Sequence, residues 1–146
     1  MAIYASNDKA RFDYEILETY EAGLVLTGQE TKSVKSGKVS IKGCYVKIIG
    51  NEAWLIGITI SPFQPGNIPP DYDAQRTRKL LLKKPEIKYL IGKSQEKGLS
   101  LVPLKLYGKN NLIKLEIGVG RGKKKYDKRE VIKKREFERK VKRIEI

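Results

Sequence analysis

Gly50 and Asn51 interrupt a stretch of the chain in which apolar and polar residues alternate. The segment before them, YVKII (residues 45–49), and the segment after them, EAWLIGITI (residues 52–60), both have the two-residue period of a β-strand. Two such segments joined by a two-residue turn of this composition predict an antiparallel hairpin. We therefore expect these residues to form two neighbouring strands of one sheet.

A second hairpin is predicted nearer the C-terminus, where LSLVPLKLY (residues 99–107) and LIKLEIGV (residues 112–119) flank the turn segment GKNN. The alternation places one set of apolar side chains on a single face of each strand. These sets are Val102, Leu104 and Leu106 in the first strand and Ile113, Leu115, Ile117 and Val119 in the second. Pro103 has no N–H to donate to a ladder, so its strand is expected to be an edge there or to carry a bulge.

Two helices are expected between the strands. Thr27 and Glu30 have the spacing of a capping box, and the glycine after Ser36 suits the position past a helix end, so residues 28–36 are predicted to be helical. Pro85 suits the first turn of a second helix, which ends at Gly98. The buried stripe of that helix is expected to contain Ile87, Leu90 and Ile91.

The elements together predict a mainly β fold with short helices. DYEILETYEAGLVL (residues 13–26) fits a strand, or a bent pair of strands around Gly23, and brings the number of strands to about six. In so short a chain a closed or nearly closed barrel removes sheet edges, so the expected architecture is an OB-like antiparallel β-barrel over residues 1–120. Residues 61–76 contain four prolines and no periodicity, and are expected to form a long surface loop.

The charge of the chain points to a polyanionic partner. Lys and Arg total 31 against 17 Asp and Glu, a net charge of +14, which favours nucleic acid first and an acidic membrane surface second. Thirteen of the basic and five of the acidic residues lie in residues 121–146. No apolar run approaches the roughly 20 residues of a membrane span. No signal-peptide pattern opens the sequence, and we expect a cytoplasmic protein.

The composition argues against several kinds of active site. The chain has no histidine and a single cysteine, Cys44, which excludes an internal disulfide, a multi-cysteine zinc site and a hydrolase triad that depends on a histidine base. Cys44 is best interpreted as a small buried residue on a strand. We expect no catalytic residue, no metal site and no cofactor.

Residues 121–146 are expected to form a basic tail that is disordered or loosely helical when free. Phe137, Val141 and Ile144 lie at helical spacing, but the remaining face is charged all round, so little apolar area is available to offset the cost of ordering the chain. Phosphate would shift this balance, because Lys and Arg release counterions from a nucleic acid. The alternative, a tail that only increases solubility, accounts less well for Tyr126 and Phe137 among the cations, since aromatic rings suit stacking on bases.

Four blocks in the same order resemble the SsrA-binding protein family, small protein B, whose members are bacterial partners of transfer-messenger RNA. The blocks are NDKARFDYEILETYEAGLVLTGQETKSVKSGK, RTRKLLLKKPEIKYLIGK, KGLSLVPLKLYGKNN and GRGKKKYDKR. The resemblance implies an OB-like barrel with three helices, an RNA-binding face, and a tail that folds only on the ribosome. It also implies binding to the tRNA-like domain of transfer-messenger RNA and delivery to stalled ribosomes for trans-translation, the rescue and tagging of incomplete proteins.

The same resemblance implies which partners and residues are involved. The tail would occupy the empty mRNA channel and the decoding centre formed by 16S rRNA, and elongation factor Tu would act through the RNA complex. Independently of the resemblance, we expect a monomer, because the sequence shows no wide unsatisfied apolar face. The implied RNA-binding residues are Asn7, Lys9, Ala10, Glu21, Lys32, Arg76, Arg78, Lys79, Leu81 and Lys83. Of these, Arg76, Arg78 and Lys79 are implied to contact phosphate. The implied ribosome-binding tail residues are Gly122, Lys123, Lys124, Tyr126, Asp127, Lys128 and Arg129, with Gly122 as a hinge. Lys83 departs from the family pattern, in which a polar uncharged residue or histidine is expected. Tyr126 stands where the family has an aromatic residue or histidine, and it keeps the flat ring but cannot be protonated near neutral pH.

Two other functions remain open from the sequence. A general OB-fold RNA-binding or ribosome-associated protein without a tagging role would share the basic barrel. A metal-dependent nuclease is a remote alternative, because Asp71 followed by Glu86 and Lys88 has the residue types of a magnesium site. Such a site requires Glu86 and Lys88 on one strand, whereas Pro85 predicts a helix there.

Overall fold

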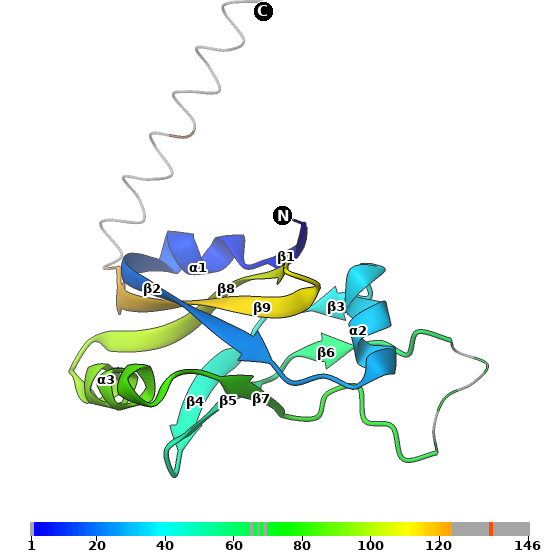
Figure 1. Cartoon of the computed structure of the whole chain (residues 1–146). Coiled ribbons are helices and arrows are strands. Elements are labelled where there is room, and N and C mark those ends of the chain that lie inside the picture. The colour runs from blue at the N-terminus through cyan, green and yellow to red at the C-terminus, as the bar shows by residue number, and fades with distance from the viewer. Residues whose placement is uncertain (1, 65, 67, 69, 124–134, 136–146) are drawn as a thin grey trace, which may run out of the picture.

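The protein is a curled antiparallel sheet with three short helices, as seen in a computed structural model that describes residues 2–64, 66, 68, 70–123 and 135 (Figure 1). The helices are α1 (Asp8–Asp13), α2 (Gly28–Lys35) and α3 (Lys84–Gln95). The strands are β1 (Ile3–Ser6), β2 (Tyr14–Leu24), β3 (Val39–Ser40), β4 (Tyr45–Ile49), β5 (Glu52–Ile56), β6 (Thr59–Ile60), β7 (Arg78–Leu81), β8 (Leu99–Lys109) and β9 (Leu112–Gly122). The predicted mainly β class with short helices is confirmed.

Seven of these strands form one antiparallel sheet in the order β1-β8-β9-β2-β7-β5-β4, and β3 pairs with β6 separately. The large sheet bends so that β4 approaches β8, although hydrogen bonds do not close it and β1 and β4 remain its ends (Figure 1). The main core fills the inside of the curl and includes Ala22, Leu55, Leu80, Leu106 and Leu115. The sheet is therefore not a closed barrel, although its two parts come into contact where β4 approaches β8.

Both predicted hairpins are present with the expected turns. The segment predicted as one strand over residues 52–60 is wrong in part, because it divides into β5 and β6, and β6 pairs with β3 in the separate sheet. Asn51 adopts a φ of 66° and Gly50 one of 57°, and Ile49 is paired with Glu52 across the turn. In the second hairpin, Asn110 and Asn111 have φ values of 53° and 63°. Asparagine tolerates this left-handed backbone better than most residues, which explains how a turn without glycine at these two positions can connect β8 to β9.

The face predicted for β8 is partly wrong, because the register shifts between Pro103 and Lys105. The shift turns Val102 and Leu104 to the outside of the curl, where they pack with Ala10 of α1 in a second small cluster. Leu106 remains in the main core. The predicted bulge at the proline is therefore confirmed, and its consequence is that one strand contributes apolar side chains to both sides of the sheet.

Helix α2 begins at the predicted residue and ends at Lys35, one residue before the predicted end. The backbone N–H of Thr27 donates to Glu30 at 3.0 Å, and the backbone N–H of Glu30 donates to the Thr27 hydroxyl at 3.2 Å, which completes the capping box. Gly37 follows the helix with a φ of 79°. The third helix ends at Gln95, three residues before Gly98, and its Leu90 is fully buried.

The N-terminal part of the chain differs from the prediction, and other parts agree with it. β1 and α1 precede the first predicted strand, and β2 is a single strand of 11 residues, not two strands around Gly23. Cys44 is buried as predicted, but it lies one residue before β4 and not on a strand, and burial raises the pKa of its thiol to about 12. In the described residues between β6 and β7 the chain forms no further strand of the sheet, in agreement with the predicted loop. None of the described helices combines the length and the apolar character needed to cross a membrane.

Candidate nucleic-acid interface

β7 divides the predicted RNA-binding residues between two sides of the sheet. Side chains of a strand alternate, so Arg78 and Leu80 point to the interior, where both are at most 1% exposed. Lys79 and Leu81 point outward, and the side chain of Lys79 is 42% exposed while Leu81 is 55% exposed. Of the four residues of β7, only Lys79 and Leu81 are therefore available to an RNA on the barrel surface.

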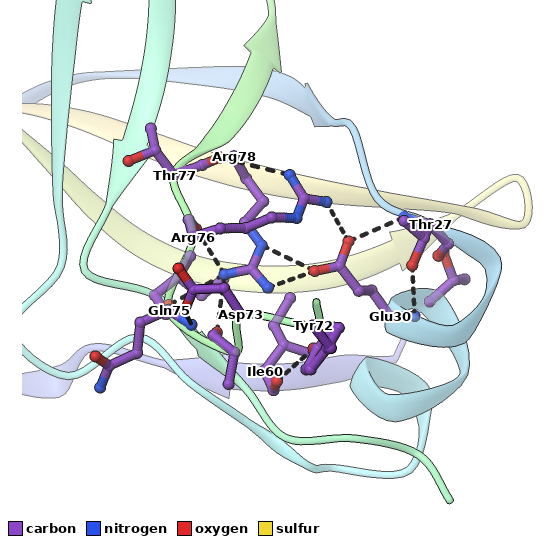
Figure 2. Close-up of polar contacts among 12 residues, drawn as sticks. Thr27, Glu30, Ile60, Tyr72, Asp73, Gln75, Arg76, Thr77 and Arg78 are labelled. Carbon is purple, nitrogen blue, oxygen red and sulfur yellow. Dashed lines mark hydrogen bonds and ion pairs between the residues drawn. The ribbon is translucent and has the colours of Figure 1, made fainter. Parts of the chain in front are cut away.

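Glu30 binds both of the predicted phosphate-binding arginines (Figure 2). Its Oε1 accepts from Nη2 of Arg76, and its Oε2 accepts from Nη2 and, at 3.0 Å, from Nε of Arg78. The remaining guanidinium nitrogen of Arg78, Nη1, donates to three carbonyl oxygens. These belong to Arg76 at 2.6 Å, Ala74 at 2.9 Å and Ile58 at 3.3 Å.

The prediction that Arg78 contacts phosphate is therefore corrected. Every nitrogen of its guanidinium has an acceptor inside the protein, and a residue with no exposed surface cannot reach an RNA phosphate without dismantling this network. Its three carbonyl contacts instead fix the end of the long loop. Arg76 differs, because its side chain is 39% exposed and presents the outer edge of the same ion-pair cluster to solvent.

The pKa of Glu30 reflects the balance within this cluster. Burial on its own raises the pKa of a carboxyl group, but the hydrogen bond from Thr27 and the two arginines outweigh burial, so the Glu30 pKa lies below its usual value. The carboxylate is consequently charged at neutral pH and holds α2 to the start of β7. Tyr72 supports the same region by donating its hydroxyl to the carbonyl oxygen of Ile60 at 2.6 Å (Figure 2).

Glu21 lies on the outward side of β2 with its carboxylate held by two neighbours. The Tyr107 hydroxyl donates to Oε2, and Nζ of Lys109 lies 3.4 Å from the same oxygen. The hydrogen bond from Tyr107 is the largest cause of a lowered Glu21 pKa, and Lys109 adds to it. The Glu21 side chain is 38% exposed, so one carboxylate oxygen is fixed while the group remains open to a ligand.

Glu21, Leu81 and Lys79 form a continuous outer face. Glu21 is two residues from Gly23 on β2, and Gly23 is paired with Leu81 of β7. A Cβ added at Gly23 would lie 3.4 Å from Cβ of Leu81, so the two strands are in contact on this side. Lys79 follows two residues along the same strand and face. The structure thus brings three of the predicted RNA-binding residues together.

The three N-terminal site residues have mixed environments. The backbone N–H of Asn7 donates to the Leu104 carbonyl at 2.8 Å, and its Nδ2 donates to the Pro103 carbonyl at 3.0 Å. Ala10 is 4% exposed in the cluster under α1, whereas Lys9 is exposed. Asn7 and Ala10 therefore hold α1 on the sheet. All three line a groove of about 500 Å³ that extends to Gly43–Val46 and Leu99–Val102.

Two predicted lysines lie at helix ends. Lys32 of α2 places Nζ 6.0 Å from the centre of the Phe63 ring, and Lys38 approaches the same ring to 5.8 Å. Lys83 is exposed immediately before α3, and its backbone N–H donates to Glu86 at 3.1 Å. Glu86 therefore caps the start of α3. In the described part of the chain, no three His, Cys, Asp or Glu side chains are grouped so that they could hold a metal ion, such as the magnesium of the nuclease alternative.

The base of the C-terminal segment is fixed to α1. The backbone N–H of Lys123 donates to the Asp13 carbonyl at 2.8 Å, and its Nζ donates to the Arg11 carbonyl at 3.2 Å. Gly122 pairs with Tyr14 as the last residue of β9, its φ lies outside the left-handed region, and an added Cβ would meet nothing within 4 Å. The hinge role implied for Gly122 stays a prediction. Lys124, Tyr126, Asp127, Lys128 and Arg129 lie outside the described residues.

The comparisons with known proteins cover nearly the whole chain. A family model described as "SmpB protein" matches residues 4–145. This chain belongs to the SmpB family. Two relatives named SsrA-binding protein are 50% identical in Thermosynechococcus vestitus and 54% identical in Anoxybacillus flavithermus, each over 97% of this chain and 93% and 91% of theirs. A solved chain described as "tmRNA-SmpB: a journey to the center of the bacterial ribosome" is 45% identical, with a TM-score of 0.68 over 82% of this chain and 84% of that one.

Sequence reasoning missed the residues that orient this SmpB-family surface. Glu30 was predicted only as a helix cap, although a carboxylate that also binds two arginines organises the loop and β7. Tyr107, which holds Glu21, was not singled out. The two-residue alternation of a strand could have indicated that Arg78 is buried, since it places Arg78 and Lys79 on opposite faces of β7. No local signal links Tyr107 to Glu21, because they are 86 residues apart.

Proposed function

We propose that this chain binds transfer-messenger RNA and delivers it to stalled ribosomes, where it takes part in trans-translation. The observation that carries the proposal is the near-full-length similarity to SsrA-binding proteins together with a solved neighbour described by tmRNA, SmpB and the bacterial ribosome. The net charge of +14 and the open face around Glu21, Leu81 and Lys79 supply the chemistry that such a partner requires. This function would be exerted in the cytoplasm, and we assign the protein no catalytic step and no cofactor.

The outer face would grip the tRNA-like domain of the RNA. Lys79 and Arg76 present partly exposed cations for phosphate contacts, which give affinity and orientation without sequence preference. Glu21 offers an oriented carboxylate oxygen, which can accept hydrogen bonds from base amino groups. Leu81 adds an exposed apolar side chain between them. Lys9, Lys32 and Lys83 are further exposed cations that we assign to the RNA.

Residues 124–146 would serve the ribosome. Their basic composition suits the phosphates of 16S rRNA along an empty mRNA channel and at the decoding centre. Tyr126 would stack on a base there, and Lys124, Asp127, Lys128 and Arg129 would make polar contacts. Elongation factor Tu would join through the RNA and not through the barrel. We further propose a monomer with a division of labour between residues 1–120 and residues 121–146.

The division of labour is tested by truncating the chain after Gly122. We expect the truncated protein to bind transfer-messenger RNA with nearly unchanged affinity in a gel-shift titration, and to fail in tagging on ribosomes stalled on a message without a stop codon. Bulk tRNA as competitor provides the specificity control. Equal affinity for both RNAs would identify a general RNA-binding protein, and a hundredfold loss of RNA affinity on truncation would contradict the separation of the two functions.

A further inference from the structure

Three strands on one side of the curl align a tryptophan between two lysines. Lys47 of β4 is paired with Trp54 of β5, and Trp54 is paired with Lys79 of β7. Directly paired residues in antiparallel strands point to the same side, with Cβ atoms about 4.5–5.5 Å apart. The neighbours of Trp54 along β5, Ala53 and Leu55, are fully buried. Trp54 and the two lysines therefore point outward.

The same surface exposes apolar side chains around this row. Tyr45 and Ile49 lie two residues before and after Lys47, and they are 50% and 53% exposed. Leu81 lies two residues after Lys79 and is 55% exposed. Isolated apolar residues on a surface are ordinary, but a contiguous group around a half-buried indole marks an interaction surface. We call these side chains, with Lys47, Trp54 and Lys79, the tryptophan face.

The charges of the tryptophan face select an RNA as its occupant. Its two lysines are paired with the tryptophan from the neighbouring strands on either side, in a protein of net charge +14. Glu52 forms an ion pair with Lys79, with Oε1 3.6 Å from Nζ and a side chain that is 48% exposed. An ion pair this open contributes little to stability and is easily exchanged for phosphate. An aromatic ring bordered by cations binds single-stranded nucleic acid, since bases stack on the ring while phosphates meet the cations.

The tryptophan face is continuous with the proposed RNA-binding residues. Lys79 and Leu81 belong to both, and Leu81 is paired with Gly23 beside Glu21. A single RNA that contacts Glu21 and Leu81 would therefore reach Trp54 by crossing one further strand. We propose that the tryptophan face binds unpaired nucleotides of the same transfer-messenger RNA, with one base stacked on Trp54. This inference rests on the proposed function and extends its site to β4 and β5.

The experiment uses Trp54 as its own reporter, because it is the only tryptophan of the chain. Titrating the full chain with transfer-messenger RNA should quench the indole fluorescence and protect it from acrylamide, at the same RNA concentration that gives half-maximal gel shift. Trp54→Ala should weaken binding roughly five- to hundredfold, and Trp54→Phe should retain part of the affinity. Thermal unfolding of each variant shows whether the barrel is intact.

Lys47→Gln keeps the proposal testable if Trp54→Ala unfolds the barrel, because Lys47 is an exposed residue on an end strand of the sheet. It should lower the log-log slope of affinity against salt by about one, whereas Lys97→Gln, an exposed lysine before β8, should leave the slope unchanged.

The outcomes separate the two proposals. Normal RNA binding with an unquenched indole and wild-type behaviour of the Trp54→Phe and Lys47→Gln variants would overturn the tryptophan face alone. Absence of any binding to transfer-messenger RNA by the full chain would overturn the proposed function and this inference with it. Quenching by ribosomes but not by transfer-messenger RNA would assign the face to ribosomal RNA and refute the occupant proposed here.

Discussion

Replacing Glu30 by glutamine should destabilise the barrel strongly, because it leaves Arg78 charged and buried. The Arg78 side chain has no exposed surface and takes two of its contacts from the Glu30 carboxylate. Removing one partner of such a pair costs about 3–5 kcal/mol. The amide oxygen of glutamine and the three carbonyl acceptors of Nη1 remain, so we expect the lower limit, about 3 kcal/mol.

This loss is measurable by urea unfolding and by thermal unfolding. For a chain of this size about 3 kcal/mol corresponds to a decrease in Tm of roughly 10 °C. Glu52→Gln is the matched control, since it removes a carboxylate 3.6 Å from Lys79 in an exposed pair and should change stability by less than about 1 kcal/mol. Equal effects of the two substitutions would refute the argument that burial makes the Glu30 cluster stabilising.

The pH dependence gives an independent check. The Glu30 pKa is lowered in the folded protein, so its contribution to stability is complete above the ordinary value of 4.5 and is lost as the pH falls through the folded pKa. The difference in stability between wild type and Glu30→Gln should therefore be constant from pH 5 to pH 7 and shrink in more acidic solution. A difference that grows below pH 4.5 would contradict the sign of this linkage.

Three further substitutions test other parts of the structure. Gly118→Ala places a Cβ 2.9 Å from Cδ1 of Leu104 and should lower the free energy of unfolding, measured in urea, by about 1–3 kcal/mol, whereas Gly122→Ala, with open space around it, should have no measurable effect on it. Lys79→Gln should reduce the salt dependence of RNA affinity by about one unit of log-log slope, and an unchanged slope would exclude Lys79 as a phosphate contact. Tyr107→Phe removes the main cause of the lowered Glu21 pKa, so an NMR titration should show the Glu21 carboxylate protonating at higher pH than in wild type.

Local rules were sufficient for most of the secondary structure. The Gly50-Asn51 turn fixed the pairing of its two strands, and the capping box of α2 formed at the predicted residues. They were insufficient where one residue changes the face of a strand. The bulge at Pro103 was expected. The sequence did not show that the bulge would place Val102 and Leu104 on the opposite face from Leu106, where they pack against Ala10 of α1.

The candidate site was predictable in composition but not in arrangement. Family resemblance identified Arg76, Arg78 and Lys79 as one basic group, and strand alternation alone would have separated Arg78 from Lys79. What the sequence could not supply was the acceptor for Arg78, because Glu30 is 48 residues away. The register of the first hairpin, by contrast, already places Lys47 opposite Trp54, so the tryptophan face could have been found from the turn.

The hydrogen bonds from Lys123 to the end of α1 fix the place on the barrel at which the C-terminal segment begins. The 23 residues after Lys123 start from one fixed point, and covalent geometry limits their reach to about 80 Å when fully extended. The greatest distance that each of these residues can lie from the proposed RNA-binding face is thus set by the number of residues between it and Lys123. Adding or removing a few glycines just after this anchor would offset every later contact by a known length while leaving the grip on RNA unaltered.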